Sequence, residues 1–236
     1  MSLAGKVALV TGGTGALGRA VVQRLVRDGA AVHVPCIVKA ELEDCRKTLG
    51  EVFAQATIHE ANVAREAEVE KLFAAVASKS GRLDVLANIV GGFAFAALSE
   101  TDPATWQRML ELNATTCFLC CRAAAPLMKR SGGGRIVNVS AGPAINRGVP
   151  NMSAYGASKA AVLNLTQTLA QELGADRITV NALVPSIIDT PANRKAMPEA
   201  DTSTWLAPAE IANVIGFLAS PEGAIVTGAA LTLSRG

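Results

Sequence analysis

Short apolar runs alternate along the whole chain with longer segments of helical periodicity, and this alternation constrains the fold most. Residues 6–11 form an apolar run closed by glycines, which is typical of a strand buried on both faces. Residues 17–28 follow, with Leu17, Val21 and Leu25 spaced to form one apolar helix face. Parallel strands need connections of this length. The sequence therefore predicts an α/β fold, a doubly wound parallel sheet of the Rossmann type.

The same pattern continues to the end of the chain. Strands are predicted at 6–11, 30–35, 56–60, 83–88, 135–140, 177–184 and 229–233, about seven in all. Helices are predicted at 17–28, 40–49, 65–79, 103–130, 153–173 and 208–219, the fourth bent near Pro126. Residues 185–207 are expected to be a long irregular excursion of the kind that covers binding sites. Because no linker divides the chain, we expect residues 1–236 to form one domain with helices on both faces of the sheet.

Composition excludes several classes of protein. The 22 basic and 20 acidic residues leave a net charge of +2, which gives no basic footprint for a nucleic acid. Apolar runs fall short of the roughly 18 residues of a membrane span, and the first residues do not resemble a secretory leader. Five cysteines in a chain too long to need disulfides predict reduced thiols. We expect a cytoplasmic protein with a small-molecule substrate and neither nucleic-acid nor membrane partners.

A glycine-rich turn, TGGTGALG at 11–18, lies between the first predicted strand and helix. Small residues let the backbone approach a pyrophosphate, and the following helix offers free N–H groups and the positive end of its dipole. A purely structural tight turn is the alternative. The position favours a dinucleotide site for NAD(H) or NADP(H), with contacts from Gly12, Thr14, Gly15, Ala16, Leu17 and Gly18.

The end of the second predicted strand leaves the choice between the two cofactors open. A carboxylate there would bind ribose hydroxyls, and a cation would bind a 2′-phosphate. The chain offers Cys36, a candidate cofactor contact, followed by two apolar residues. The nearest cations, Lys39 and Arg19, lean slightly toward NADP(H).

Tyr155 and Lys159 carry the most specific chemistry. Residues at i and i+4 share a helix face, so a phenol and an ammonium can converge on one ligand. A nearby ammonium is expected to lower the pKa of the phenol and fit it for proton transfer. Tyr155 is the only tyrosine of the chain. The alternative is a surface tyrosine beside a surface lysine.

With the glycine turn, these residues resemble the short-chain dehydrogenase/reductase family over essentially the whole chain. Gly12 and Gly18 match the TG-x-x-x-G-x-G pattern, whereas Ala16 replaces its middle glycine. The resemblance implies hydride transfer from nicotinamide, ribose binding by Lys159, and a water-relay or helix-organising role for Asn113. It also implies a homodimer or homotetramer. Further implied cofactor contacts are Asn62, Val63, Asn88, Gly91, Pro185, Ile188 and Thr190, together with Tyr155 and Lys159.

The chain departs from the family pattern after the fifth predicted strand. The serine that usually holds the substrate carbonyl is missing, since Ala141 and Gly142 occupy its neighbourhood and Ser140 falls one place early. Loss of such a donor costs about 2.7–4 kcal/mol in barrier height. A dinucleotide-binding sensor or structural subunit without turnover is therefore kept as an alternative.

Three segments, at 15–18, 91–94 and 189–205, look like dihydropteridine reductases. Those members of the family lack the serine, keep the tyrosine and lysine, and use NADH to reduce quinonoid dihydropterin. This resemblance leans toward NADH and predicts a pterin-like or otherwise activated substrate, which accepts hydride readily. An ordinary carbonyl or alcohol substrate is the alternative. Candidate substrate contacts are Phe93, Ser140, Ala141, Asn193, Met197 and Trp205.

Other residues suggest metal binding at first sight. Cys117, Cys120 and Cys121 lie in an apolar helical segment, and the chain lacks the histidine spacing that would complete a zinc site. We expect these cysteines to pack in the core. His33 and His59 are expected to be structural, and no metal site is predicted.

Overall fold

Seven parallel strands form one sheet in the order β3-β2-β1-β4-β5-β6-β7, in a computed structural model that describes residues 2–145 and 148–235. The strands are β1 Val7–Thr11, β2 Ala31–Cys36, β3 Thr57–Glu60, β4 Val85–Asn88, β5 Gly134–Val139, β6 Ile178–Pro185 and β7 Ala230–Leu233. Each of the seven predicted strands is confirmed within one or two residues. The predicted doubly wound parallel sheet is therefore confirmed.

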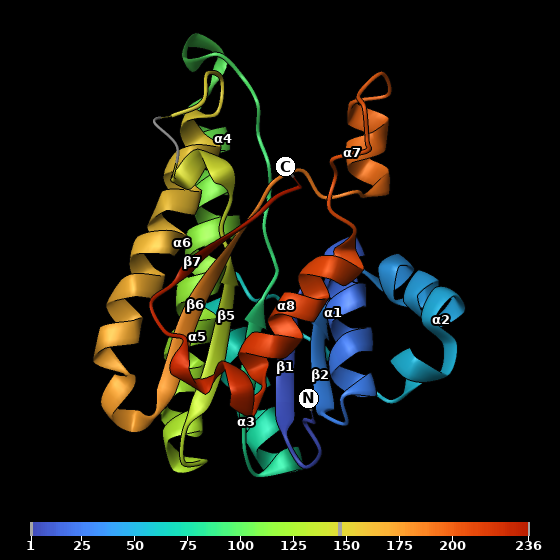
Figure 1. The fold of residues 1–236 in the computed structure, drawn as a ribbon, viewed down its shortest axis with the longest axis vertical. Coiled ribbons are helices and arrows are strands. Elements are labelled where there is room, and N and C mark those ends of the chain that lie inside the picture. The colour runs from blue at the N-terminus through green and yellow to red at the C-terminus, as the bar shows by residue number, and fades with distance from the viewer. Residues whose placement is uncertain (1, 146–147, 236) are drawn as a thin grey trace.

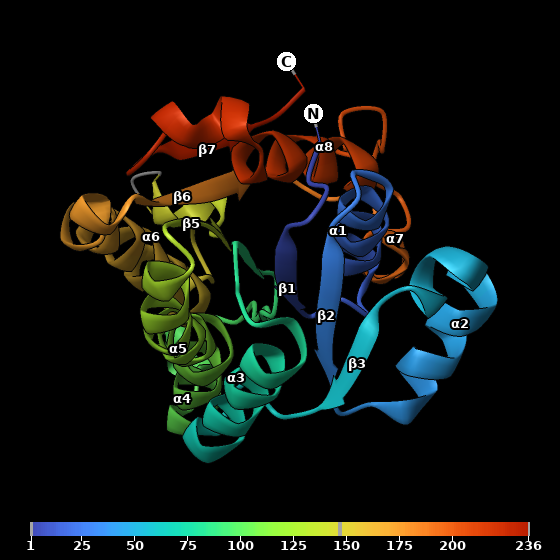
Figure 2. The ribbon, with the colours of Figure 1, turned by 90° about the horizontal axis from the view of Figure 1, so that it is seen from below.

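Helices cover both faces of this sheet (Figures 1 and 2). They are α1 Ala16–Arg27, α2 Lys39–Ala54, α3 Glu66–Ser80, α4 Pro103–Met109, α5 Thr116–Arg130, α6 Ser153–Glu172, α7 Pro191–Ala196 and α8 Pro208–Ala219. Figure 2 shows α1 and α8 on one face and α3 and α5 on the other. Among the described residues, the structure contains no helix that is both long and apolar enough to cross a membrane.

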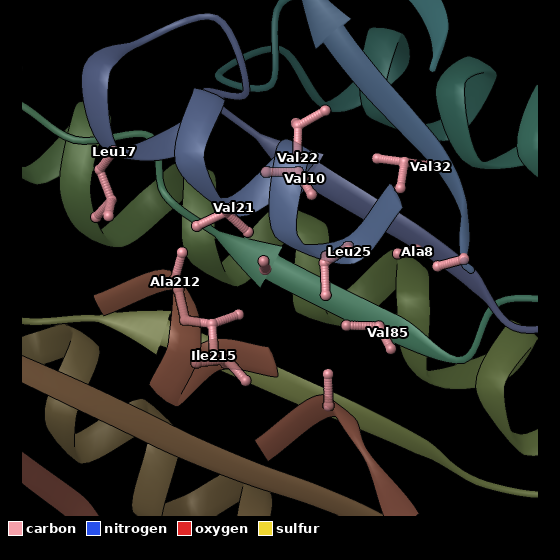
Figure 3. Close-up of a cluster of buried hydrophobic side chains, with 14 of the residues drawn as sticks. Ala8, Val10, Leu17, Val21, Val22, Leu25, Val32, Val85, Ala212 and Ile215 are labelled. Carbon is pink, nitrogen blue, oxygen red and sulfur yellow. The ribbon is translucent and has the colours of Figure 1, made fainter. Parts of the chain in front are cut away.

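Strand β1 explains why its sequence is apolar without alternation. Ala8 and Val10 point into a core shared with α1 and α8, where they meet Val21 and Ile215 (Figure 3). The alternate residues of β1, among them Leu9, belong to a second core with α3 and α5. Because successive side chains point to opposite faces, a strand between two helical layers must be apolar at every position.

The predicted long helix at 103–130 is wrong in one respect. It is interrupted not at Pro126 but by a π-helical turn, Leu110–Thr115, that separates α4 from α5. Pro126 lies inside α5 and is exposed, and the helix continues past it to Arg130. The π turn instead contains the buried Asn113.

Two further expectations need correction. The segment 185–207 is not wholly irregular, because it contains α7 and a bridge between Ile188 and Leu206. Thr190 caps α7 and Pro191 occupies its first turn, a combination that favours helix initiation. Helix α2 runs past the predicted 40–49 to Ala54, with a kink at Gly50, whose φ is +50°. A left-handed φ is one that glycine adopts at little cost.

The sheet order also predicts where a ligand binds. The chain builds β1, β2 and β3 outward in one direction and then starts β4 on the opposite side of β1. Ligands of open α/β sheets bind at the carboxyl ends of the strands where the order reverses. That point lies at Thr11 of β1 and Asn88 of β4, which pair directly.

His33 and His59 meet across β2 and β3, a contact that the sequence pattern did not reveal. The Nδ1 atom of His33 lies 2.8 Å from Nε2 of His59, and its Nε2 lies 2.8 Å from Oγ of Ser80. The two rings stack with centroids 5.1 Å apart. Burial, followed by the nearby His59 and Lys79, lowers the pKa of His33 to about 4. The histidines are structural, as expected, and neutral in the folded protein.

This pair makes the stability of the fold depend on pH. An unfolded His33 has its ordinary pKa of 6.5, against about 4 when folded, so the unfolded chain takes up the proton first as the pH falls. Stability is therefore lost between pH 6.5 and pH 4, by about 2 kcal/mol from pH 7 to pH 5. Urea unfolding at both pH values should show a smaller loss in His33→Asn. An equal loss in both proteins would contradict the assignment.

Candidate active site

The glycine-rich turn joins β1 to α1 at the point where the strand order reverses. Gly15 is the N-cap of α1 and makes no side-chain cap, so the first N–H groups of the helix are left without a side-chain partner. A Cβ added to Gly18 would lie 1.9 Å from the carbonyl oxygen of Gly12. The backbone is therefore packed against itself, with an uncapped helix N-terminus that fits a dinucleotide pyrophosphate.

Tyr155 lies in the first turn of α6, with Lys159 one turn later, as predicted. The Nζ atom of Lys159 is 6.0 Å from the centroid of the Tyr155 ring and donates a hydrogen bond of 2.9 Å to the carbonyl of Val139. Lys159 is buried, and burial lowers its pKa to about 8. The carboxyl end of β5 therefore holds the ammonium beneath the phenol.

The expected lowering of the Tyr155 pKa is wrong for the protein alone. Burial raises the pKa of Tyr155 to about 12, because the phenolate loses its hydration. Lys159, at 6.0 Å from the ring centroid, does not overcome this cost. The phenol consequently holds its proton at neutral pH and is set up to donate it.

Asn113 organises the floor of the site. Its Oδ1 accepts a hydrogen bond of 2.9 Å from the N–H of Gly92, and its Nδ2 donates to the Gly92 carbonyl at 3.1 Å and to Oγ of Ser158 at 2.9 Å. These bonds connect the π turn to the segment after β4 and to α6. The whole amide is therefore used in positioning its neighbours.

The backbone of Gly91 lies close to both this amide and the buried lysine. A Cβ added to Gly91 would lie 2.7 Å from Oδ1 of Asn113 and 3.2 Å from Nζ of Lys159. Any side chain at this position would collide with these two polar groups, so glycine is what allows the backbone to approach them. The fold thus brings together Gly91, Asn113 and the Tyr155–Lys159 pair, which come from three separate parts of the sequence.

The edge of β5 presents no free hydroxyl beside Tyr155. Ser140 is buried and donates its hydroxyl proton to the carbonyl of Lys159 at 2.8 Å. Ala141, the next residue, is buried and carries only a methyl group. The sequence indicated that the usual serine donor to the substrate is missing. Ser140 does not replace it, because its hydroxyl proton is already donated to the carbonyl of Lys159.

Aromatic side chains border Tyr155 on the other side. Phe93 contacts its ring edge-to-face, with centroids 5.0 Å apart, and remains 61% exposed. Phe95, two residues further along the same segment, is 58% exposed. The N–H of Ala96 donates to the carbonyl of Asn151 at 2.9 Å, which ties this segment to the chain just before α6. Exposed aromatic rings beside a reactive phenol form an apolar wall.

The structure places the other predicted cofactor contacts around the carboxyl edge. Cys36 lies with its Sγ 3.9 Å from Oγ1 of Thr14. Asn62 uses its side chain to accept from the N–H of Ala64, and Val63 is buried. Asn88 donates to Oδ1 of Asn138 at 2.8 Å, while its own Oδ1 is buried without a partner among the described residues. Asn62 and Asn88 are therefore partly used in holding the fold.

The segment after β6 behaves differently from a free loop. Thr190 accepts from the N–H of Asn193 as the N-cap of α7, and the amide of Asn193 donates to the carbonyl of Ile188 at 2.8 Å. Met197 follows α7 and is half-buried, whereas Trp205 is only 4% exposed. Helix α7 stands at the upper end of the sheet in Figure 1, across from α4. Pro185 ends β6 at the same edge.

Sequence reasoning missed two residues of the site. Ser158 accepts from Asn113 and donates to the carbonyl of Tyr155 at 2.7 Å, so it connects the π turn to α6. Its position next to Lys159 was the available indication. Glu41 accepts a hydrogen bond of 2.7 Å from the hydroxyl of Thr14, which no local pattern predicts.

The three clustered cysteines lie where the sequence placed them. Cys117, Cys120 and Cys121 are buried in the core that α5 shares with α3 and β4. All five cysteines of the chain are free thiols. The expectation that these cysteines act as small core residues is confirmed.

Comparisons with known proteins agree with this geometry. A family model described as short chain dehydrogenase matches residues 6–201. The 3alpha-hydroxysteroid dehydrogenase of Mediterraneibacter gnavus is 36% identical over 244 residues, covering 99% of this chain and 97% of that protein. A 3-oxoacyl-(acyl-carrier-protein) reductase of Thermotoga maritima is 34% identical, with 100% and 99% covered. The crystal structure of NAD⁺-bound xylitol dehydrogenase matches with a TM-score of 0.91 and 27% identity, covering 100% of both chains.

Two glycine-to-alanine substitutions test whether the close backbone contact at Gly18 requires glycine. One adds a methyl group at this crowded position, and the other adds it at the uncrowded Gly15. In Gly18→Ala the methyl group meets backbone at 1.9 Å, whereas in Gly15→Ala its nearest neighbour lies at an ordinary 3.5 Å. We expect Gly18→Ala to lower the free energy of unfolding by about 1–3 kcal/mol, the usual cost of overpacking. Gly15→Ala should cost less, at most about 1 kcal/mol, because its only penalty is that alanine is a poorer N-cap than glycine. Urea unfolding of both variants tests this, and equal effects would contradict it.

Proposed function

We propose that Tyr155 exchanges a proton with the substrate of this protein. The chain belongs to the short-chain dehydrogenase family and is an NAD(P)-dependent oxidoreductase. One observation carries the proposal: Tyr155, Lys159 and Asn113 meet at the carboxyl edge of the sheet, where the backbone of Gly91 lies against Asn113 and Lys159 too closely for any side chain. This edge also contains the glycine-rich turn.

In the reduction direction, side chains of the protein supply the proton and hold the reacting groups in place. The phenol of Tyr155 donates its proton to the substrate oxygen or nitrogen, because its raised pKa keeps it protonated at neutral pH. A bound NAD(P)H supplies the hydride. Lys159 holds its charge beneath the phenol and is placed to bind a ribose hydroxyl. Asn113 acts as a positioning residue, because its side-chain amide is already bonded to Gly92 and Ser158.

The remaining assignments to the cofactor follow from the place of each residue at this edge. We assign cofactor contact to the turn and to the segments that end β2, β3, β4 and β6. The residues are Gly12, Thr14, Gly15, Ala16, Leu17, Gly18, Cys36, Asn62, Val63, Asn88, Gly91, Pro185, Ile188 and Thr190. Their support is the uncapped start of α1 and the close approach at Gly18.

For the substrate we propose a carbonyl or alcohol on an apolar, ring-bearing body. Phe93 and Phe95 expose their rings beside Tyr155, and Ile145 and Ile187 are further exposed apolar residues near the ends of β5 and β6. Such a wall favours a flat apolar molecule over a charged one. The name of the hydroxysteroid dehydrogenase relative describes a substrate of this kind.

A quinonoid dihydropterin, predicted from the narrower resemblance, is the second candidate. The observation that favours it is the methyl group of Ala141 together with the engaged hydroxyl of Ser140. A carbonyl oxygen would receive a hydrogen bond from Tyr155 alone, which suits a substrate that already accepts hydride readily. The other proposed substrate contacts are Asn193, Met197 and Trp205.

We further propose that the chain assembles with copies of itself in the cytoplasm. A groove between α5 and α6 is lined by Phe118, Pro126, Leu169 and Leu173, and Phe118 is 47% exposed. The five free thiols favour a reducing compartment. Light scattering should give two or four times the mass of one chain, and the mass of a single chain would contradict assembly.

Replacing Tyr155 by Phe tests the proposed function. The variant keeps the ring packed against Phe93 but lacks the proton, so kcat/KM should fall by about 10²–10⁴-fold while the melting temperature is unchanged. The assay follows NADH and NADPH oxidation with an apolar cyclic ketone and, separately, with quinonoid dihydropterin. The substrate that is turned over decides between the two candidates. Activity that survives the substitution would contradict the role of Tyr155.

A further inference from the structure

A carboxylate reaches the glycine-rich turn from helix α2. Glu41, in the first turn of α2, accepts a hydrogen bond of 2.7 Å from Oγ1 of Thr14. Cys36, the last residue of β2, lies with its Sγ 3.9 Å from the same hydroxyl. Glu41 therefore lies at the junction between the turn and the end of β2, although it follows that strand by five residues in the sequence.

Arg19, the half-buried cation beside the turn, is already paired within the protein. The Nε atom of Arg19 donates to the carbonyl of Thr14 at 2.6 Å, and its guanidinium pairs with Asp44 at 2.6 Å. Asp44 therefore offsets the charge of Arg19, and Glu41 adds a further negative charge beside Thr14. Lys39, exposed at the start of α2, is the remaining cation of this junction. The sequence suggested that Arg19 favours NADP(H) by binding its 2′-phosphate, and this pairing with Asp44 removes that argument.

In dinucleotide-binding sheets the adenosine ribose lies between the glycine turn and the end of β2. A carboxylate there accepts hydrogen bonds from ribose hydroxyls, whereas a 2′-phosphate would bring a charge of nearly −2 against it. We propose that Glu41 selects NAD(H) over NADP(H), doing from α2 what a carboxylate at the strand end would do. The inference rests on the proposed dinucleotide site at the turn.

The test compares Glu41→Gln with Glu43→Gln in direct binding of NADH and NADPH by calorimetry. Glutamine keeps the shape of Glu41 and its bond to Thr14 but removes the charge. Glu43 is an exposed carboxylate of the same helix and serves as the matched control. Both substitutions lie on an exposed helix surface, and thermal unfolding confirms that each variant is folded.

We expect the unaltered protein to bind NADH at least ~10-fold more tightly than NADPH, as a carboxylate close to a 2′-phosphate requires. Glu41→Gln should narrow this ratio by about tenfold, mainly through tighter NADPH binding, and Glu43→Gln should leave it unchanged.

Four results would overturn the inference. A preference for NADPH that Lys39→Gln abolishes would assign selectivity to the cation instead. An unchanged ratio in Glu41→Gln would show that the carboxylate does not discriminate. Failure to bind either cofactor would overturn the proposed dinucleotide site as well, and so differs from equal binding of both, which overturns the inference alone.

Discussion

Parallel pairing of all seven strands is the constraint on which the rest of this molecule depends. It sends every carboxyl end to one edge, so residues far apart in the sequence meet there: Thr11 pairs with Asn88, and Asn88 with Asn138. It also requires a helix between successive strands, which covers both faces. Polar groups buried at that edge are stabilised by partners within the protein, although Oδ1 of Asn88 has none among the described residues.

Several polar groups at this edge form hydrogen bonds with one another. Asn88 donates to Asn138, and Asn138 donates in turn to Thr166 of α6 at 2.9 Å. Nearer the start of α6, Lys159 donates a hydrogen bond to the carbonyl of Val139, and Ser158 accepts one from Asn113. Helix α6 is thereby fixed to β4, β5 and the π turn by buried hydrogen bonds. Such bonds hold the phenol of Tyr155 in one place before any ligand arrives.

The predictable parts of this protein are those encoded in local spacing. The apolar run at β1 predicts a strand buried on both faces. The four-residue separation of Tyr155 and Lys159 predicts that both side chains lie on one helix face. Contacts between segments are not encoded in this way: Glu41 reaches Thr14, and His33 meets His59, only because the sheet places β2 beside β1 and β3. The Tyr155 pKa was predicted with the wrong sign for the same reason, since burial is a property of the assembled site.

The central claim is that Tyr155 is the sole hydroxyl donor to the substrate, because Ser140 is engaged and Ala141 has no hydroxyl. The most direct measurement is kcat/KM for an apolar cyclic ketone in the unaltered protein and in Ala141→Ser. We predict that kcat/KM rises about tenfold or more in the variant, toward the roughly 10²–10³-fold value of one such donor. A kcat/KM that the added hydroxyl of Ala141→Ser does not increase would contradict the claim that the site lacks a second donor.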